Sequence, residues 1–392
     1  MKHSWPSLPV VFVYLCFMLF LILAAEYWRY AGNDIASYSD STRSSTLYDK
    51  YCVHYNMIAP KFTDFDRITQ IVHVSADVLD KRIIEQVENW DGPVSMSVVL
   101  RSVAQYHCTA RFLKKIRRLS ADVERHLRAH LVFPKTLTTN CSAPFIPPSL
   151  SSASECEKHQ VPSVEQIALY PANIARNIAR IFSASKYIVI ADYEHFFSKG
   201  FEKTVRAVAH SRLAEKPRTM LVYRIFEVDE RVKELPQIKT EHNSPTSWAN
   251  AFTTVPCRSF VSPFSHPVLS ISAIINHPST GLIPHLFRYT RWNWEPQFVS
   301  HWQIPLHDEN FPFQLRDNTV LRWEMCRANY TIDVLDDVFV FHRGIKRMSV
   351  GGKVLAVQKR NAARFERALL AFKERMNNSY PNTAKLCPPL QR

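Results

Sequence analysis

The spacing of hydrophobic residues changes twice along residues 67–100, from that of a strand to that of a helix and back. Residues 67–74 (RITQIVHV) form a compact run rich in β-branched side chains, and residues 94–100 (VSMSVVL) alternate between polar and apolar positions. Between these two runs, apolar residues at positions 78, 79, 83, 84 and 87 repeat with the spacing of one helix face. A strand, a helix and a second strand in this order predict a βαβ unit, whose two strands lie parallel in one sheet.

A second helix and strand lead to a pair of acidic residues. Residues 171–182 (PANIARNIARIF) begin with proline at a first helical position and carry isoleucine at 174, 178 and 181, so they predict an amphipathic helix. Residues 187–191 (YIVIA) have the composition of a buried strand, and Asp192 and Glu194 follow directly. Because open α/β sheets bind ligands beyond the carboxyl ends of their strands, this position is a candidate site.

The rest of the pattern is less regular. Residues 107–131 predict a helix, residues 131–133 a short strand, and residues 134–162, which are rich in Pro, Ser and Thr, a loop. A further helix begins at residue 201. We therefore predict an α/β fold with a mostly parallel central sheet and no internal repeat.

The N-terminal segment has a different character. Residues 8–25 form an uninterrupted apolar run without a charge, long enough to span a bilayer as a helix. Tyr27, Trp28 and Tyr30 follow, where aromatic rings favour the membrane interface. A cleaved signal peptide is the alternative, but the run is longer than a usual signal core, and Leu23 stands where a small residue is preferred before a cleavage site. We favour an uncleaved signal anchor.

Either alternative delivers the rest of the chain to the secretory lumen. With an anchor, the chain divides into a cytoplasmic tail (1–7), a transmembrane helix (8–30), a polar Ser/Thr-rich stem (31–60) and a lumenal domain (61–392).

Sequons and cysteines agree with a lumenal domain. Asn140, Asn329 and Asn377 each begin a glycosylation sequon, although such triplets also arise by chance. Of the eight cysteines one, Cys16, lies in the apolar run, which leaves seven for the lumen. Most of these should form disulfides in an oxidising compartment, with at least one left over. No CxxC pair occurs, so a zinc site is not expected.

Composition and charge argue against several classes of protein. Glycine is scarce (7 residues), and neither GxxxxGK[ST] nor GxGxxG occurs, which argues against P-loop and dinucleotide-binding enzymes. The net charge of +14 invites a nucleic-acid partner, but the basic residues are spread along the chain, with short clusters such as residues 114–118. We expect no nucleic-acid partner. A mildly basic surface equally suits anionic glycans or nucleotide sugars.

The Asp192–Glu194 pair suggests metal chemistry. A nucleotide diphosphate concentrates negative charge, and Mg²⁺ or Mn²⁺ held by one or two carboxylates plus phosphate oxygens neutralises it. Two acids separated by one residue, in a loop after a strand, can both reach one cation. The alternative is a solvated turn, because D-x-E also occurs by chance.

Longer segments resemble a known family. The stretch YPANIARNIARIFSASKYIVIADYEHFFSKGF resembles the core of glycosyltransferase family 49, the family of the LARGE-type and β-1,4-glucuronyltransferase enzymes, in which YPxNxLRNxA leads through a strand to an Asp-x-Asp motif. RITQIVHVSADVLDKRIIEQVENWDGPVSMSVVL resembles its first strand–helix–strand unit, WNWEPQFVSHWQIPLHDENF its W-E-P and D-E-R-F segments, and VLDDVFVFHRGIK its closing strand. These blocks follow the family order from about residue 67 to residue 350, so together they are far more specific than any single motif.

The resemblance implies a GT-A fold, a UDP-sugar donor, a divalent cation (Mn²⁺ or Mg²⁺) and inversion at the anomeric carbon. By the same resemblance, Asp192, Glu194 and His342 hold the metal, although a lone histidine at a strand end is more often structural. Asp308 or Glu309 is the candidate general base that deprotonates the acceptor hydroxyl. The alternative is that these two acids cap a turn.

Further residues are assigned to the two substrates. Trp294 and Glu295 are expected to shape the acceptor pocket, unless the aromatic ring belongs to the core. Ser75, Arg176 and Asn177 are expected to bind the donor, although the two helical residues could equally satisfy buried carbonyls.

The chain departs from the family pattern at three places. Glu194 stands where the family usually has Asp, one methylene shorter. Asn310 replaces the arginine of D-E-R-F, and residues 313–315 (Phe-Gln-Leu) stand where the family has glycine–tyrosine–glycine. Glycine permits unusual dihedrals and close backbone approach, which Phe and Leu do not. We expect the fold to be kept and the acceptor side to be altered.

The expected function is that of a single-pass type II Golgi membrane glycosyltransferase. It would transfer glucuronic acid, or N-acetylglucosamine as the nearest alternative, from a UDP-sugar to a glycan or glycoprotein acceptor, while metal and basic residues stabilise the departing diphosphate. A catalytically degenerate relative that binds glycans or assists another transferase is the alternative. The altered D-E-N-F segment favours that alternative, and Asp192, Glu194 and His342 oppose it. A secreted adhesion or structural protein would leave the ordered motif blocks unexplained.

Overall fold

The computed structural model describes residues 45–138, 140–143, 161–228, 257–259, 283–287, 289–344 and 351–391. The expected anchor (8–30) and the tail before it lie outside the described residues. In the part of the chain that is described, no helix is long and apolar enough to cross a membrane. The chain from Leu47 onward forms one compact unit.

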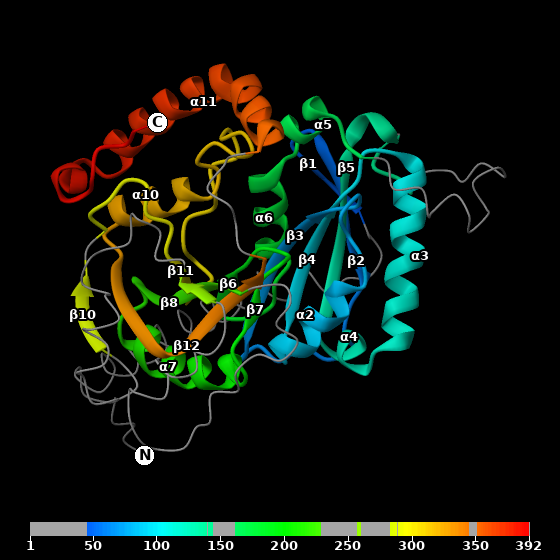
Figure 1. Cartoon of the computed structure of the whole chain (residues 1–392), viewed down its shortest axis with the longest axis horizontal. Helices are drawn as coiled ribbons and strands as arrows, with labels where there is room; N and C mark the ends of the chain where they lie inside the picture. Colours follow the sequence, from blue (N-terminus) through cyan, green and yellow to red (C-terminus); the bar gives the residue numbers. More distant parts are fainter. Residues whose placement is uncertain are drawn as a thin grey trace, which may run out of the picture. The chain divides into compact units, whose positions relative to one another are not determined.

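The described strands form one mixed sheet (Figure 1). Its order is β1-β2-β5-β4-β3-β6-β11-β8-β12-β10, while β7 pairs with β12 and β9 pairs with β8. The strands are β1 (Ser45–Tyr48), β2 (Tyr51–Ile58), β3 (Ile68–Ser75), β4 (Val94–Val99), β5 (Leu127–Pro134), β6 (Tyr187–Ile190), β7 (Phe196–Phe197), β8 (Thr219–Val228), β9 (Cys257–Ser259), β10 (Ile283–Phe287), β11 (Gln297–His301) and β12 (Thr331–Arg343).

Helices cover both faces of this sheet. Those on one face are α2 (Arg82–Trp90), α3 (Val103–Leu119), α4 (Ala121–His126) and α7 (Phe201–Glu215). Those on the other face are α6 (Ala172–Ile181), α10 (Thr319–Arg327) and α11 (Gly352–Ser379). The short α5 (Val164–Ala168) precedes α6 and contacts α11, and two 3₁₀ helices are η1 (Lys135–Leu137) and η5 (Pro381–Leu386).

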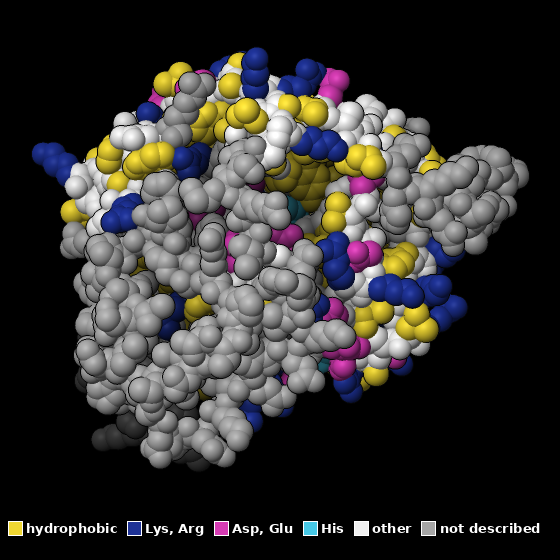
Figure 2. All heavy atoms as spheres, in the orientation of Figure 1, with side chains coloured by type: hydrophobic (Ala, Val, Ile, Leu, Met, Phe, Trp, Pro, Cys, Tyr) yellow, Lys and Arg dark blue, Asp and Glu magenta, His cyan; other side chains and the backbone are white. Residues whose placement is uncertain are grey.

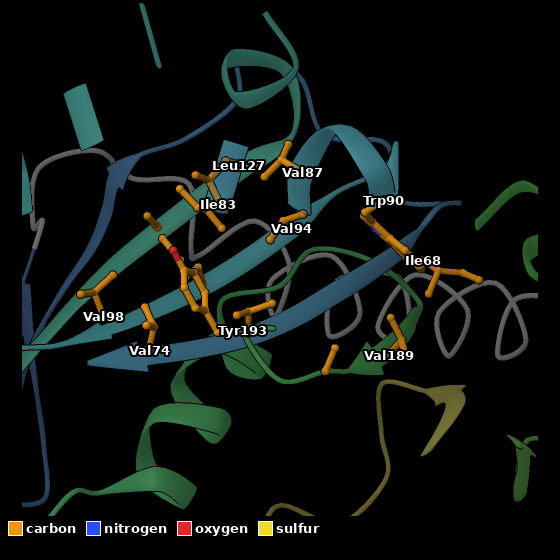
Figure 3. Close-up of a cluster of buried hydrophobic side chains, with 14 of the residues drawn as sticks. Ile68, Val74, Ile83, Val87, Trp90, Val94, Val98, Leu127, Val189 and Tyr193 are labelled. Atoms are coloured by element: carbon orange, nitrogen blue, oxygen red, sulfur yellow. The ribbon is translucent and has the colours of Figure 1, made fainter. Parts of the chain in front are cut away.

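The predicted βαβ unit is confirmed. β3 and β4 are parallel neighbours, and α2 connects them. Ile83, Val87 and Trp90 of α2 are buried and pack against apolar side chains of the strands (Figure 3). Each such side chain stabilises the fold by about 1.5–3 kcal/mol through removal from water.

The prediction of a mostly parallel sheet is wrong. β5, β4, β3 and β6 are parallel, but β11 runs antiparallel to both β6 and β8, and β2 runs antiparallel to β5. β8 and β12 form a second parallel pair beyond β11. The strand directions could not be predicted from the sequence, because a short apolar run such as residues 297–301 does not indicate the direction in which the strand runs.

Two predicted boundaries also differ from the structure. The helix expected over residues 107–131 ends at Leu119, because Ser120 begins α4 by accepting a hydrogen bond from the backbone N–H of Val123. Residues 51–58, expected in the stem, form β2, whose Cys52 and Ile58 are buried in the core. The folded unit therefore starts before residue 61.

Disulfides tie both ends of the unit. Cys52–Cys141 joins β2 to the segment after β5, and Cys326–Cys387 joins α10 to the C-terminal segment. Cys108 is also disulfide-bonded. These bonds agree with the expectation that most cysteines form pairs.

The three predicted glycosylation sites are all exposed. Asn140 and Asn329 lie in left-handed turns. Asn377 lies on α11, where its side-chain oxygen accepts hydrogen bonds from Arg327 at 3.3 and 3.4 Å. Their glycosylation stays a prediction.

Candidate active site

A cleft of about 1240 Å³ opens at the carboxyl ends of β3, β4 and β6. One wall consists of the residues that end or follow these strands, at 75–78, 99–101 and 192–194. A second wall consists of residues 313–318 and part of α11. Figure 2 shows a hollow on this face of the molecule, with acidic side chains beside it. The acidic pair thus lies at the edge of the sheet where parallel strands direct ligands.

Asp192 and Glu194 are open to the cleft because the residue between them faces the core. Tyr193 is buried, and its hydroxyl donates to the carbonyl of Asp80 at 3.0 Å and accepts from the backbone N–H of Asp80 at 3.1 Å. The side chain of Asp192 is 48% exposed, and Glu194 is exposed. His195 supports this turn: its backbone N–H donates to the carbonyl of Asp192 at 3.0 Å.

The ring of His342 faces that of His195, which directly follows the acidic pair. The rings of His195 and His342 are nearly parallel with centroids 6.4 Å apart, and Nε2 of His195 is 3.7 Å from the Asp192 carboxylate. Nε2 of His342 is 3.4 Å from the carboxylate of Glu227 on β8. Among the described residues, no group of three or more His, Cys, Asp or Glu side chains is arranged to hold a metal ion. The metal role of His342 therefore stays a prediction.

Ser75 belongs to a hydrogen-bonded network at the end of β3. Its hydroxyl donates to the carboxylate of Asp77 at 2.7 Å. Asp77 also accepts from Arg101 at 2.5 Å and from Gln105 at 2.7 Å. Ser75, Asp77 and Arg101 all line the cleft, so the network fixes charged and polar groups on its wall. This position suits the predicted donor-binding role of Ser75.

Arg176 is buried beside the cleft and links α6 to the second wall. Its guanidinium forms an ion pair with Asp317 at 2.8 Å. Burial opposes the charge, but Asp317 and Asp192 raise the pKa of Arg176 above its ordinary value. Burial, with the nearby Arg176, lowers the pKa of His73 to about 3, so this cleft histidine is neutral at physiological pH.

Asn177 faces away from the cleft. Its side-chain amide donates to the carbonyl of His307 at 2.9 Å and to the carboxylate of Glu309 at 2.7 Å. On the same side of α6, Asn173 and Arg180 donate to backbone carbonyls between residues 302 and 308. For Asn177 the structure thus matches the alternative that it satisfies a buried carbonyl.

Asp308 and Glu309 line a second pocket, of about 1040 Å³. Asp308 forms an ion pair with Arg375 at 3.1 Å, and Glu309 accepts from the hydroxyl of Tyr48 at 2.6 Å. Neither carboxylate lines the cleft that contains Asp192. The structure therefore does not bring the predicted general base together with the predicted metal pair.

Of the two residues predicted for the acceptor pocket, one packs against the core and the other lines the cleft. Trp294 packs at the edge of the core formed around α10 and α11, with its ring stacked on Tyr289 at 5.8 Å. Glu295 is exposed and lines the cleft, and its carboxylate accepts a hydrogen bond from the hydroxyl of Thr319.

The second wall keeps glycine-like backbone conformations without glycine. Gln314 has φ 65° and Arg316 has φ 56°, both in the left-handed region. From the sequence we expected no left-handed backbone dihedrals in this segment, because Phe313 and Leu315 replace the glycines of the family. The structure has left-handed dihedrals at the residue after each of these two, Gln314 and Arg316.

Sequence reasoning missed Asp77, Arg101 and Asp317, which all line the cleft. Asp77 and Arg101 each stand two residues beyond the end of a parallel strand, so the rule that singled out Asp192 applies to them as well. Asp317 gives no such signal, since only the fold brings it to Arg176.

Comparisons with known proteins agree with the motif blocks. A family model for glycosyltransferase family 49, described as a glycosyl-transferase for dystroglycan, matches residues 67–381. β-1,4-Glucuronyltransferase 1 of Homo sapiens is 22% identical over 333 residues, which cover 80% of this chain and 76% of that protein. The Mus musculus protein of the same name is 23% identical over 333 residues with the same coverage.

Solved structures give a weaker likeness. GalNAc-T7 with UDP, GalNAc and Mn²⁺ aligns at a TM-score of 0.38 and 10% identity, over 84% of this chain and 53% of that chain. S. aureus TarS 1–349 in complex with UDP aligns at 0.34 and 11% identity, over 81% and 73%. These TM-scores are too low to carry an argument about fold or ligand. Because the family model covers most of the sequence, the chain belongs to glycosyltransferase family 49, as a homologue of β-1,4-glucuronyltransferase 1.

Proposed function

We propose that this protein is a GT-A-fold glycosyltransferase that transfers a sugar from a UDP-sugar to a glycan or glycoprotein acceptor with inversion. Glucuronic acid is the first candidate sugar, because the relatives are named as glucuronyltransferases. N-Acetylglucosamine is the second. The observation that carries this proposal is the pair of open carboxylates, Asp192 and Glu194, in a cleft at the carboxyl edge of the parallel strands.

The acidic pair suits a divalent cation. Mn²⁺ and Mg²⁺ keep several water or phosphate ligands and are bound through one or two protein carboxylates in nucleotide sites. Asp192 and Glu194 supply two carboxylates open to the cleft, and Glu194 retains the charge of the aspartate more usual in the family. A cation bound there would neutralise the negative charge that develops on the leaving diphosphate.

The cleft walls also carry groups that could bind the diphosphate and accept the proton of the acceptor hydroxyl. Arg176, fixed by Asp317, adds positive charge near Asp192, which helps to accommodate a diphosphate. The sequence predicted Asp308 or Glu309 as general base. Within the cleft itself Glu295 is an exposed carboxylate, and we propose that it accepts the proton from the acceptor hydroxyl.

We also propose a type II Golgi membrane protein with its catalytic domain in the lumen. The apolar run at residues 8–25 supports an anchor. Support for the lumenal side comes from the Cys52–Cys141 and Cys326–Cys387 disulfides and from the exposed sequons. Fluorescence microscopy of the tagged full chain against Golgi markers, with sensitivity of the glycans to N-glycosidase, tests this assignment.

The activity is tested with the lumenal part, residues 31–392, and a panel of UDP-sugars with and without Mn²⁺. We expect metal-dependent release of UDP that Asp192→Asn abolishes. Asp122→Asn, a surface substitution on α4, is the matched control and should retain activity. A well-folded protein that neither binds nor turns over any UDP-sugar would refute the transferase.

A degenerate family member is the second candidate, favoured by the altered D-E-N-F segment at Asn310 and by residues 313–315, where the family has glycine–tyrosine–glycine. Such a protein would bind glycans without releasing UDP. Glycan-array binding that persists in Asp192→Asn, in the absence of turnover by the unmodified protein, would support this alternative.

A further inference from the structure

The second pocket, of about 1040 Å³, has no role in the proposed transfer of a sugar. It lies on the side of α6 that carries Asn177, and its walls are the segment 303–310, the end of α10 and the turn between α11 and η5. Among the described residues, none lines both this pocket and the cleft. A cavity of this size is comparable to a small-molecule site, so its occupant needs an explanation.

One predicted glycosylation site is part of the pocket wall. Asn329 lines the pocket, is exposed, and follows the end of α10 with φ 61°. Its backbone N–H donates to the carbonyl of Cys326 at 2.9 Å, and Cys326 is bonded to Cys387. Thr331, the last residue of the sequon, begins β12. The asparagine is therefore held at a fixed point of the wall by the helix, the strand and the disulfide.

The formal charges of the pocket walls cancel. Three carboxylates and three guanidinium groups line the pocket, from Asp308, Glu309, Glu324, Arg218, Arg327 and Arg375. Burial, together with nearby arginines, lowers the pKa of His307 well below its ordinary value, so this histidine adds no charge at physiological pH. A polyanion such as a nucleotide diphosphate gains no net attraction from such walls. The pocket therefore suits a neutral, polar ligand.

The groups in these walls suit hydroxyl-rich ligands. Arg375 pairs with Glu324 at 2.6 Å and with Asp308 at 3.1 Å, which fixes a guanidinium and two carboxylates in one wall. A sugar hydroxyl both donates and accepts hydrogen bonds, so it can use either kind of group. Tyr330 and Tyr380 add two partly buried rings, each with an apolar face and a polar hydroxyl, as a pyranose has apolar and polar faces. Neutral sugars thus match the pocket chemically.

The other predicted glycosylation sites lack such a pocket. Asn140 and Asn377 are exposed, and neither lines this pocket or the cleft. Among the described residues that line the pocket, only Asn329 begins a sequon. A glycan on Asn329 is attached at the wall itself, so its effective concentration at the pocket greatly exceeds that of a free sugar.

We propose that Asn329 carries an N-linked glycan and that the first sugars of this glycan fill the second pocket. These inner sugars are neutral N-acetylglucosamine and mannose units. The inference requires that the chain enters the secretory lumen, as proposed above, but not that the cleft transfers a sugar. The seated glycan stabilises the fold, because its contacts with the walls are absent from the unfolded chain.

Attachment uses the lipid-linked oligosaccharide of the lumen as donor. The side-chain amide nitrogen of Asn329 forms a bond to C1 of the first N-acetylglucosamine. The bond between C1 and the lipid diphosphate breaks, and the amide nitrogen loses one proton as the diphosphate leaves. Nothing is oxidised or reduced, and the chain folds around the attached sugars.

The test is digestion of the folded, full-length chain with endoglycosidase H. The protein is made in animal cells with kifunensine, which keeps N-glycans in the high-mannose form that this enzyme cleaves, and is solubilised in mild detergent. Mass spectrometry of peptides follows each sequon with time. Because the walls shield the cleavage point, release at Asn329 should be at least about 10-fold slower than at Asn140 or Asn377, and should become fast after denaturation.

Two tryptophan substitutions on η5 test whether the pocket causes this protection. Asn382 is exposed and lines the pocket, so Asn382→Trp should fill the space and remove the protection. Lys385 is exposed on the same 3₁₀ helix and does not line the pocket, so Lys385→Trp is the matched control and should keep the protection. Neither position is buried, so both variants should melt within a few degrees of the unmodified protein.

Slow release at Asn329 that Asn382→Trp accelerates and Lys385→Trp does not supports the inference. An unmodified Asn329, or release as fast as from the denatured protein, overturns it. Slow release that Asn382→Trp leaves unchanged also overturns it, since something other than the pocket then shields the glycan. A glycan at Asn140 or Asn377 but not at Asn329 leaves the lumenal location intact, whereas a chain without any glycan removes that support as well. The UDP-sugar assay is independent of all these outcomes.

Discussion

Lowering the pH should destabilise the sheet through His130, which lies on β5 and is fully buried. The backbone N–H of Asn56 donates to its Nδ1 at 3.2 Å, and its Nε2 is 3.2 Å from the hydroxyl of Ser95. Ser95 in turn donates to the carbonyl of Ala179 at 2.6 Å. Nδ1 is therefore an acceptor and the ring hydrogen is on Nε2, so a second ring proton would face an N–H group.

The magnitude follows from the pKa. Burial, assisted by the charge of Arg128, lowers the pKa of His130 from 6.5 to about 3. Between these values the unfolded chain binds a proton and the folded chain does not, so stability falls as the pH falls below 6.5. From pH 7.5 to pH 5.5 this one group removes about 1.4 kcal/mol of unfolding free energy.

The assay is urea denaturation of the unmodified protein and His130→Asn at pH 7.5, 6.5 and 5.5. Asparagine keeps an acceptor near the position of Nδ1 but does not titrate. The variant should be less stable at pH 7.5 and should lose about 1.4 kcal/mol less on acidification. Other buried histidines, such as His73, act equally in both proteins and cancel in the comparison. Equal losses in the two proteins would refute a buried neutral His130.

Three further predictions concern the cleft and the fold. Glu295→Gln should lower kcat by about 100-fold or more, whereas Asp308→Asn, which breaks an ion pair outside the cleft, should mainly lower the melting temperature. Steady-state kinetics and thermal melting of both variants distinguish the two effects. The reverse pattern would identify Asp308 as the general base. Removal of the Cys326–Cys387 disulfide by serine substitution, at a sequence separation of 61, should cost about 2–4 kcal/mol in urea denaturation. An unchanged midpoint would show that the bond does not constrain the unfolded chain. Gly92→Ala should lower stability by about 1–3 kcal/mol in the same assay, because a Cβ would lie 2.9 Å from a buried indole nitrogen; a neutral result would mean that this corner of the fold can shift.

The sequence predicted the parts of the fold that depend on local pattern. β3, α2 and β4 could be recognised because the change from helical to strand periodicity is visible within 30 residues or so. α6 and β6 were recognised in the same way, and the rule that parallel strands direct ligands to their carboxyl ends placed Asp192 in the cleft.

The parts that could not be predicted depend on contacts between distant segments. β11 is inserted between β6 and β8, and its five residues carry no information about direction or neighbours. Asp308 and Glu309 were assigned to the site by motif order along the chain. In space they lie by the face of α6 that carries Asn177, while Arg176, one residue earlier, faces the cleft.

The strained wall bears on whether the cleft is catalytic. A left-handed conformation at a non-glycine residue costs about 1–3 kcal/mol, and Gln314 and Arg316 both adopt it in the cleft wall. A protein that needed only to fold would be more stable with glycine at either position, so the cost is most readily understood if the two side chains contact a ligand. Asp192 and Glu194 open into the same cleft. The strained wall therefore indicates a cleft that binds a ligand, and the two carboxylates that line it favour an active transferase over a degenerate relative.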